Sequence, residues 1–266
     1  MLHSFTITFL QKGGLMKVFV RSMVCILVGL FLLPQTVLAC FDTYVFLKKS
    51  SLVYPEGQMV MEVSGEYIIP KMKNSINDLF SGGTNLYYGI SKKMSVQVGV
   101  SSSEKERSAF SIDQYGIRGV YGIVQGYRDI YNLDIVLDHA APFDGSQINF
   151  ELSTPNIFHV HNYTFVIHPV TSFGKNVKLS VRGHGGAFYQ FSNTGIIGIG
   201  AEYASGQSGS QFGQRLVKGE AGTSLFFGSQ IGSVYLQNEF IKGWGVRGND
   251  FGFATTMKII LPSFNK

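Results

Sequence analysis

The 266-residue sequence has few charged residues, almost no cysteine and no long hydrophobic run. Charged residues make up only 15% of the chain, and no basic tract stands out that would indicate a nucleic-acid partner. No apolar stretch approaches the roughly 18 residues of a membrane-spanning helix. With 45% hydrophobic residues, 32 glycines and only 7 prolines, the composition also excludes a disordered or collagen-like polymer.

The N-terminal part has the layout of a secretory signal. Lys17 and Arg21 precede an apolar stretch from Met23 to Leu33, which is followed by a proline and a small-residue ending. Because this stretch is too short to cross a hydrocarbon core of roughly 30 Å, a cleaved leader is favoured over a membrane anchor. We predict a signal peptide over residues 1–39 and export, with Met16 as an alternative start.

Cys40 is the only cysteine left after removal of this leader, because the other, Cys25, lies within it. An intramolecular disulfide in the mature chain is therefore excluded. The run Val37-Leu38-Ala39-Cys40 fits ordinary signal peptidase and also resembles a bacterial lipobox, in which the cysteine is acylated. An acylated Cys40 and an inert one both stay open, and residues 40–55 are predicted to form a short N-terminal segment.

Alternation of apolar and polar residues dominates the remaining chain. In Met94–Ser101 every even-numbered residue is apolar and every odd-numbered one is small or polar, which is the pattern of a strand with two different faces. The pattern recurs and predicts twelve strands, at 58–69, 84–90, 94–101, 110–121, 131–138, 148–152, 158–168, 177–182, 197–203, 215–227, 232–241 and 251–259.

The predicted connections fall into two alternating classes. The longer class comprises 70–83, 102–109, 139–147, 169–176, 204–214 and 242–250, and the shorter class comprises 91–93, 122–129, 153–157, 192–195 and 228–231. An even strand number with long loops at one end and short turns at the other is typical of bacterial outer-membrane barrels. We therefore predict an all-β fold, an antiparallel up-and-down transmembrane β-barrel of about 12 strands over residues 56–266.

Aromatic residues near the predicted strand ends suit the interfacial girdle of such a barrel. They are Tyr67, Tyr88, Tyr121, Tyr131, Tyr163, Tyr203, Phe227, Phe240 and Phe251. Over residues 56–262 the chain resembles the porin-like outer-membrane barrels of Gram-negative bacteria, although Pro262 interrupts the last strand before any terminal aromatic. The resemblance implies an outer-membrane location, with lipid, lipopolysaccharide and the barrel-assembly machinery as partners and the oligomeric state open. A soluble periplasmic β protein is the alternative.

Two motifs raise the question of catalysis or metal binding. Outer-membrane lipid hydrolases carry a His-x-Ser-Asn run, but here Gln190 takes the place of the histidine before Ser192-Asn193, so the serine lacks its base. A hairpin turn is favoured there, and we predict no enzyme. His159 and His161 are predicted to be lipid-facing or interfacial beside Tyr163, near the periplasmic rim, and no cysteine or nearby acid completes a metal site. No metal and no cofactor are predicted.

Charged residues on the polar face are the remaining functional feature. They comprise eight acids against five bases, with Glu62, Glu66, Arg118, Asp134, Asp138, Glu151, Lys178, Arg182, Glu202, Lys218, Glu220 and Glu239 predicted to line the lumen together with Lys258. Such charges can lock a barrel or line a wet channel. The leading hypothesis is a narrow, mildly cation-selective channel for small polar solutes or ions. A non-transporting scaffold or adhesin that acts through its loops comes second, and a lipid hydrolase third.

Overall fold

The computed structural model describes residues 52–69, 79–106, 109–127, 130–204, 220–244 and 251–262. The predicted leader and Cys40 lie outside these residues. Within them no helix is long and apolar enough to cross a membrane. The strands are β1 (Met59–Ile69), β2 (Leu79–Ser91), β3 (Met94–Glu106), β4 (Ala109–Tyr127), β5 (Tyr131–Pro142), β6 (Ile148–Ser153), β7 (Asn156–Val160), β8 (Tyr163–Lys175), β9 (Val177–Gln190), β10 (Gly195–Ala204), β11 (Glu220–Ile231), β12 (Val234–Trp244) and β13 (Phe251–Ile260).

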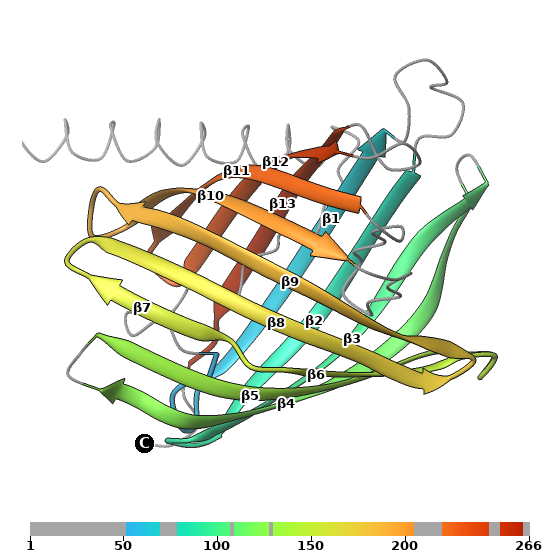
Figure 1. The fold of residues 1–266 in the computed structure, drawn as a ribbon, viewed down its shortest axis with the longest axis horizontal. Helices are drawn as coiled ribbons and strands as arrows, with labels where there is room; N and C mark the ends of the chain where they lie inside the picture. Colours follow the sequence, from blue (N-terminus) through green and yellow to red (C-terminus); the bar gives the residue numbers. More distant parts are fainter. Residues whose placement is uncertain are drawn as a thin grey trace, which may run out of the picture. The chain divides into compact units, whose positions relative to one another are not determined.

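The strands form one antiparallel sheet that closes on itself (Figure 1). Sequential neighbours pair around the sheet, β1 pairs with β13, and β4 pairs with β5 to complete the ring. Strands β6 and β7 both lie between β5 and β8, one after the other. They are therefore two halves of one barrel position, and the fold is a closed barrel of twelve strands, as the alternation predicts.

The break between β6 and β7 corrects the predicted turn at 153–157. Thr154 and Pro155 leave the strand for two residues, because proline has no N–H for the ladder. The chain then continues in the same direction, held by the bond from Asp134 N to Pro155 O at 3.2 Å. The real reversal comes at His161 and Asn162, where His161 takes a φ of 56°. The predicted strand 158–168 therefore joins parts of two strands.

The predicted long connections at 102–109 and 169–176 are also wrong. Strands β3 and β4 continue until only residues 107 and 108 separate them, and β8 continues to Lys175 before a reversal at Asn176, whose φ is 59°. Small and polar residues at these strand ends look like loop sequence, although the hairpin ladder holds them extended. One barrel end, the short-turn end, carries the connections 92–93, 128–130, 161–162, 191–194 and 232–233, and the other is the long-loop end.

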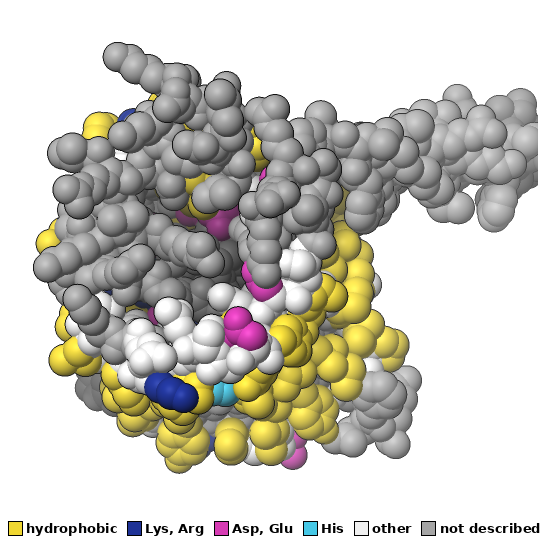
Figure 2. Space-filling view, turned by 90° about the vertical axis from the view of Figure 1, so that its right-hand side faces the viewer, with side chains coloured by type: hydrophobic (Ala, Val, Ile, Leu, Met, Phe, Trp, Pro, Cys, Tyr) yellow, Lys and Arg dark blue, Asp and Glu magenta, His cyan; other side chains and the backbone are white. Residues whose placement is uncertain are grey.

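The two faces of the barrel wall differ as the alternation predicts. Outward-facing Val98, Ile135 and Ile199 expose 45%, 37% and 61% of their surface, whereas inward-facing Gln97 and Asp134 are buried. Figure 2 shows hydrophobic side chains on the outer wall seen from the long-loop end. Several of the predicted girdle aromatics are exposed on the outer face, among them Tyr88, Tyr121, Tyr163, Tyr203, Phe227, Phe240 and Phe251. The apolar surface thus faces outward, as in a barrel surrounded by lipid.

Candidate functional site: the barrel lumen

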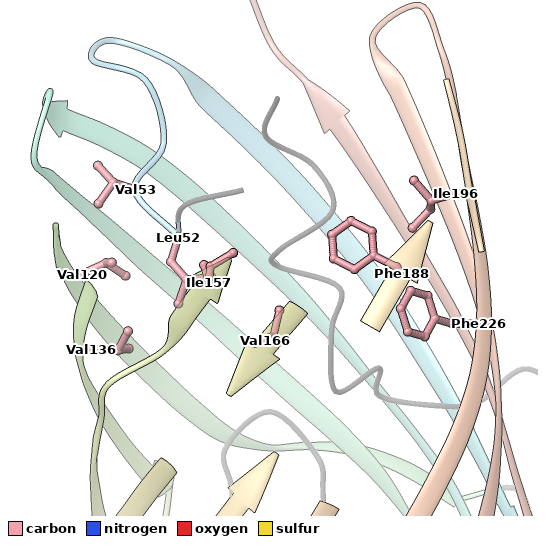
Figure 3. Close-up of a cluster of buried hydrophobic side chains, with 9 residues drawn as sticks. All are labelled: Leu52, Val53, Val120, Val136, Ile157, Val166, Phe188, Ile196 and Phe226. Carbon is pink, nitrogen blue, oxygen red and sulfur yellow. The ribbon is translucent and has the colours of Figure 1, made fainter. Parts of the chain in front are cut away.

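The N-terminal segment enters the lumen at the short-turn end. Leu52 and Val53 are buried there in one apolar cluster, which we call the septum (Figure 3). The other members of the septum come from β4, β5 and β7 to β11, and are Val120, Val136, Ile157, Val166, Phe188, Ile196 and Phe226. Apolar side chains of neighbouring strands therefore share the inner face with Leu52 and Val53, where a water-filled barrel would carry polar ones.

Hydrogen bonds fix the backbone that supplies the septum. Leu52 N donates to Asp134 Oδ2 at 2.9 Å, and Ser95 Oγ donates to Leu52 O at 3.2 Å. Gly89 makes room for the N-terminal segment, because a Cβ on this residue would stand 1.9 Å from Pro55 O. The segment is therefore hydrogen-bonded to β5 and to β3, and it packs as part of the barrel interior.

A second buried cluster contains Tyr54, the next residue of the segment. The Tyr54 ring lies 4.8 Å from the Tyr87 ring, measured between centroids, and Val60 and Tyr235 complete the buried group. Sequence reasoning predicted residues 40–55 only as a short segment before the barrel. The run Leu52-Val53-Tyr54, three large apolar side chains before Pro55, is the signal that could have indicated burial.

Charged side chains begin directly beyond the septum. In β4, β5 and β1 the next inward-facing position after a buried valine carries a charge: Arg118 follows Val120, Asp138 follows Val136 and Glu62 follows Val60. The belt is our name for the inner positions whose charged or histidine side chains lie in the four pairs described below. Its described members are Glu62, Arg118, Asp138, Glu151, Arg182, His184, Glu202 and Lys258.

Ion pairs join strands along one side of the belt, between the neighbours β4 and β5 and, across β8, between β6 and β9. Arg118 donates from Nε and Nη2 to the two carboxylate oxygens of Asp138. Arg182 Nη2 donates to Glu151 Oε2, and Ser172 Oγ donates to the other oxygen of that carboxylate at 2.9 Å. Each guanidinium is thus matched by a carboxylate on an adjacent part of the wall, which satisfies the geometry of a buried pair.

Two histidines extend this side of the belt. His184 Nδ1 lies 3.3 Å from Glu202 Oε2, and the His168 and His184 rings lie 5.5 Å apart across the β8–β9 ladder. For His159 the prediction allowed a lipid-facing or an interfacial position, and the lipid-facing alternative is wrong. Its ring turns inward, with Nδ1 3.0 Å from Thr164 Oγ1 and Nε2 3.3 Å from Asn132 Nδ2, because the reversal at residues 161 and 162 separates it from the outward face of β8.

The opposite side of the belt centres on Lys258. Its Nζ lies 3.1 Å from Glu62 Oε2 and 5.2 Å from the centroid of the Tyr87 ring. The same carboxylate accepts hydrogen bonds from Asn85 Nδ2 at 2.6 Å and from Tyr87 Oη at 2.8 Å. The Glu62 carboxylate therefore has three partners, Lys258, Asn85 and Tyr87, which fix its position.

The described lumen is richer in acids than in bases. Seven carboxylates are buried on the inner wall, belonging to Glu62, Glu66, Asp134, Asp138, Glu151, Glu202 and Glu239. The cations that face them are Arg118, Arg182 and Lys258. Lys218 and the side chains of Lys178 and Glu220 lie outside the described part of the structure. That these charges line a conducting path stays a prediction.

Ser192 lies in the turn between β9 and β10, at the short-turn end. Thr194 N donates to Ser192 Oγ at 3.3 Å, and the backbone N–H groups of Phe191 and Ser192 both point to Gly195 O. This is the geometry of a hairpin turn, and the described residues place no histidine in hydrogen bond to Ser192. Nor do they contain a group of three side chains suited to a metal ion.

Solved structures of outer-membrane channels share this fold. The KdgM porin in complex with disordered oligogalacturonate has a TM-score of 0.57 at 9% identity, over 76% of this chain and 99% of that one. The COG4313 outer membrane channel from Pseudomonas putida F1 has a TM-score of 0.61 at 10% identity, over 85% and 100%. The NanC porin has a TM-score of 0.55 at 9% identity, over 76% and 99%.

No protein-family model and no curated protein sequence matches the chain. The architecture is therefore defined by the structural comparison: a closed twelve-stranded β-barrel of the outer-membrane type.

Proposed function

We propose that the protein is a narrow outer-membrane channel for small polar solutes or ions. The observation that carries the proposal is a charged, hydrogen-bonded inner wall inside an apolar outer wall. A soluble β protein would place its apolar face inside, so this arrangement favours a barrel in lipid with a polar interior.

The balance of charge supports a wet lumen. Seven buried carboxylates face three permanent cations along the described inner wall, so the wall carries net negative charge. Buried charges with an excess of one sign are costly in a dry interior, and water or mobile cations lower this cost. We expect a mild preference for cations, weakened at high salt by screening.

The septum makes the channel narrow. Leu52 and Val53 lie inside the barrel among apolar side chains, so we expect a hydrated solute to meet an apolar constriction at the short-turn end. Apolar constrictions restrict ion flow by losing their water. We propose that small solutes pass this point only at a low rate unless the N-terminal segment moves.

A barrel without transport is the second candidate, and the septum is also the observation that favours it. In that case the protein would act as a scaffold or adhesin through its loops. A lipid hydrolase receives no support from Ser192, and we propose that the protein is not an enzyme. Lipid, lipopolysaccharide and the assembly machinery remain the proposed partners, and acylation of Cys40 remains open.

The test is reconstitution of the purified protein in planar bilayers under a potassium chloride gradient. A channel gives small unitary steps whose reversal potential is displaced toward that of potassium. Insertion without conductance, confirmed by protease protection in liposomes, would favour the scaffold. A fully water-soluble fold without detergent would overturn the barrel in lipid.

A further inference from the structure

Lys242 is a cation on the outer, lipid-facing wall of the barrel. It lies near the end of β12 on the long-loop side, and the neighbouring outward positions on its strand, Phe240 and Trp244, expose 54% and 57% of their surface. In the Cα register Lys242 stands opposite Phe251 of β13 and Thr223 of β11. These residues alternate with inward-facing ones, so the lysine belongs to the membrane border and lies apart from the belt.

Two aromatic rings hold the ammonium group of Lys242 against the wall. Its Nζ lies 4.3 Å from the centroid of the Phe251 ring and 5.6 Å from that of the Trp244 ring. The indole is itself fixed, because Trp244 Nε1 donates to Thr223 Oγ1 at 2.8 Å. Lysines at membrane borders commonly extend their ammonium groups toward water. The ring contacts instead keep this ammonium group at the level of the aromatic girdle.

Positive and negative charge lie on different faces of this part of the wall. The carboxylates described on strands β5 to β13 are all buried on the inner face and belong to Asp134, Asp138, Glu151, Glu202 and Glu239. The charged side chains described on the outer face of these strands are Lys175 and Lys242, both at the long-loop end. A ring face attracts a cation but does not cancel its charge. This end of the outer wall is therefore complementary to an anionic headgroup.

The position of Lys242 along the strand matches the level of lipid headgroups. One outward position closer to the short-turn end, the rings of Phe240 and Phe253 lie 4.9 Å apart and belong to the apolar band. The long-loop end faces the cell exterior in barrels of this type. On the β11 side the next outward positions are Thr223 and Ala201, whose side chains are small, so a headgroup can reach Lys242 from there.

We propose that Lys242, Trp244 and Phe251 bind the phosphorylated sugar headgroup of an outer-leaflet glycolipid of the lipid A type. The ammonium group of Lys242 pairs with a phosphate, which a lysine binds as a point charge. The exposed indole of Trp244 lies against the sugar ring, and the acyl chains follow the apolar wall past Phe240. A zwitterionic phospholipid carries its own ammonium group beside its phosphate and therefore meets Lys242 less favourably.

This site rests on the proposed function only in that the barrel lies in the outer membrane, and its test does not involve conduction. Trp244 is the only tryptophan of the chain, so its fluorescence reports on this cluster alone. The purified barrel in neutral detergent is titrated with lipid A, dephosphorylated lipid A, phosphatidylethanolamine and inorganic phosphate. We expect lipid A to change the emission at a concentration about tenfold lower than the other two lipids, and inorganic phosphate to leave it unchanged.

Lys242→Gln should raise the lipid A concentration at half-maximal change about tenfold, because the phosphate loses its cation. Lys242→Arg should keep most of the response, since a guanidinium also pairs with phosphate. Lys175→Gln is the matched control, because Lys175 is an outward-facing lysine at the same end that stands opposite Ile148 of β6, away from Trp244. It should leave the titration unchanged. Circular dichroism checks that each variant keeps its barrel.

Equal responses to lipid A with and without phosphate, a response to inorganic phosphate alone, or a wild-type response of Lys242→Gln would each overturn the proposal. Equal weakening by Lys175→Gln and Lys242→Gln would also overturn it, because the whole positive end of the wall would then attract the lipid. A barrel that conducts ions but fails this titration retains the channel and loses the lipid site. A barrel that responds to lipid A but stays silent in bilayers retains the lipid site and loses the channel.

Discussion

The two halves of the lumen are built on opposite principles. At the short-turn end an apolar cluster on the inner face packs like a protein core, with Phe226 and Ile157 fully buried in the same cluster as Leu52. One inward position further along β4, β5 and β1, the same face carries charges. A barrel wall can therefore change from core to channel lining within about 7 Å, the spacing of two residues on one strand face.

The two halves also differ in the interactions that stabilise them. The septum depends on apolar burial and close packing, which tolerate little added volume. The belt depends on paired charges, where loss of one partner leaves the other buried alone. Substitutions in the two halves should thus fail for different physical reasons, and the following experiments test that contrast.

The largest effect is expected in the belt. Lys258→Met should lower the free energy of unfolding by about 3–5 kcal/mol, because Glu62 keeps its burial and loses its cation. The double variant Lys258→Met with Glu62→Gln should recover most of this loss. Urea unfolding in detergent micelles, followed by tryptophan fluorescence, measures both. A single variant as stable as the wild type would show that this pair is not a structural element of the belt.

The septum should show its close packing at Gly198. A Cβ there would stand 2.3 Å from Phe226 Cζ and 2.8 Å from Ala187 O, so even alanine forces the wall or the ring to shift. Gly198→Ala should cost about 1–3 kcal/mol in the same unfolding experiment. Gly83→Ala is the matched control in the open half and should cost no more than about 0.5 kcal/mol. Equal costs would contradict a septum that is packed more tightly than the wall around Gly83.

The barrel could be predicted from the sequence because alternation is a local property. The strand number and the outward faces follow from residue type alone, as in Met94–Ser101. The turn at His161 and Asn162 could not be predicted in this way, because the alternation continues across it from His159 to Tyr163 and only the left-handed backbone reveals the reversal. Because this turn was not predicted, the side of the wall that His159 faces could not be predicted either.

The sequence contains a signal of the septum that a reading of alternation alone does not use. Ile196-Ile197, Phe226-Phe227 and Ile135-Val136-Leu137 are apolar on both faces near the short-turn end. A strand that is apolar on both faces is buried on both, in lipid outside and against something apolar inside. What fills the inside could not be predicted, because the contact between Leu52 and Ile157 joins segments that are far apart in the sequence.

The smallest effect is expected where the N-terminal segment is hydrogen-bonded to the wall. Asp134 accepts the backbone N–H of Leu52, and Asp134→Asn keeps an acceptor oxygen but removes its charge. The septum should loosen by about 1 kcal/mol, seen as faster proteolytic cleavage near Leu52. Asp144→Asn, in an exposed turn where the carboxylate bonds Ser146 N, is the control and should leave cleavage unchanged. Unchanged cleavage in both variants would mean that packing alone holds the segment.

The measurement that tests the account most directly is the conductance of a barrel whose septum is removed. Replacing Leu52-Val53-Tyr54 by Gly-Ser-Gly takes away the apolar side chains that the N-terminal segment buries inside the barrel and leaves the belt intact. Replacing Lys92-Lys93 by Gly-Ser at the same end is the control, since this turn lies outside the lumen. We predict a severalfold larger, cation-selective unitary conductance for the first variant and wild-type conductance for the second. Equal conductance of all three proteins, or anion selectivity of the opened barrel, would contradict an apolar septum that closes an acidic channel.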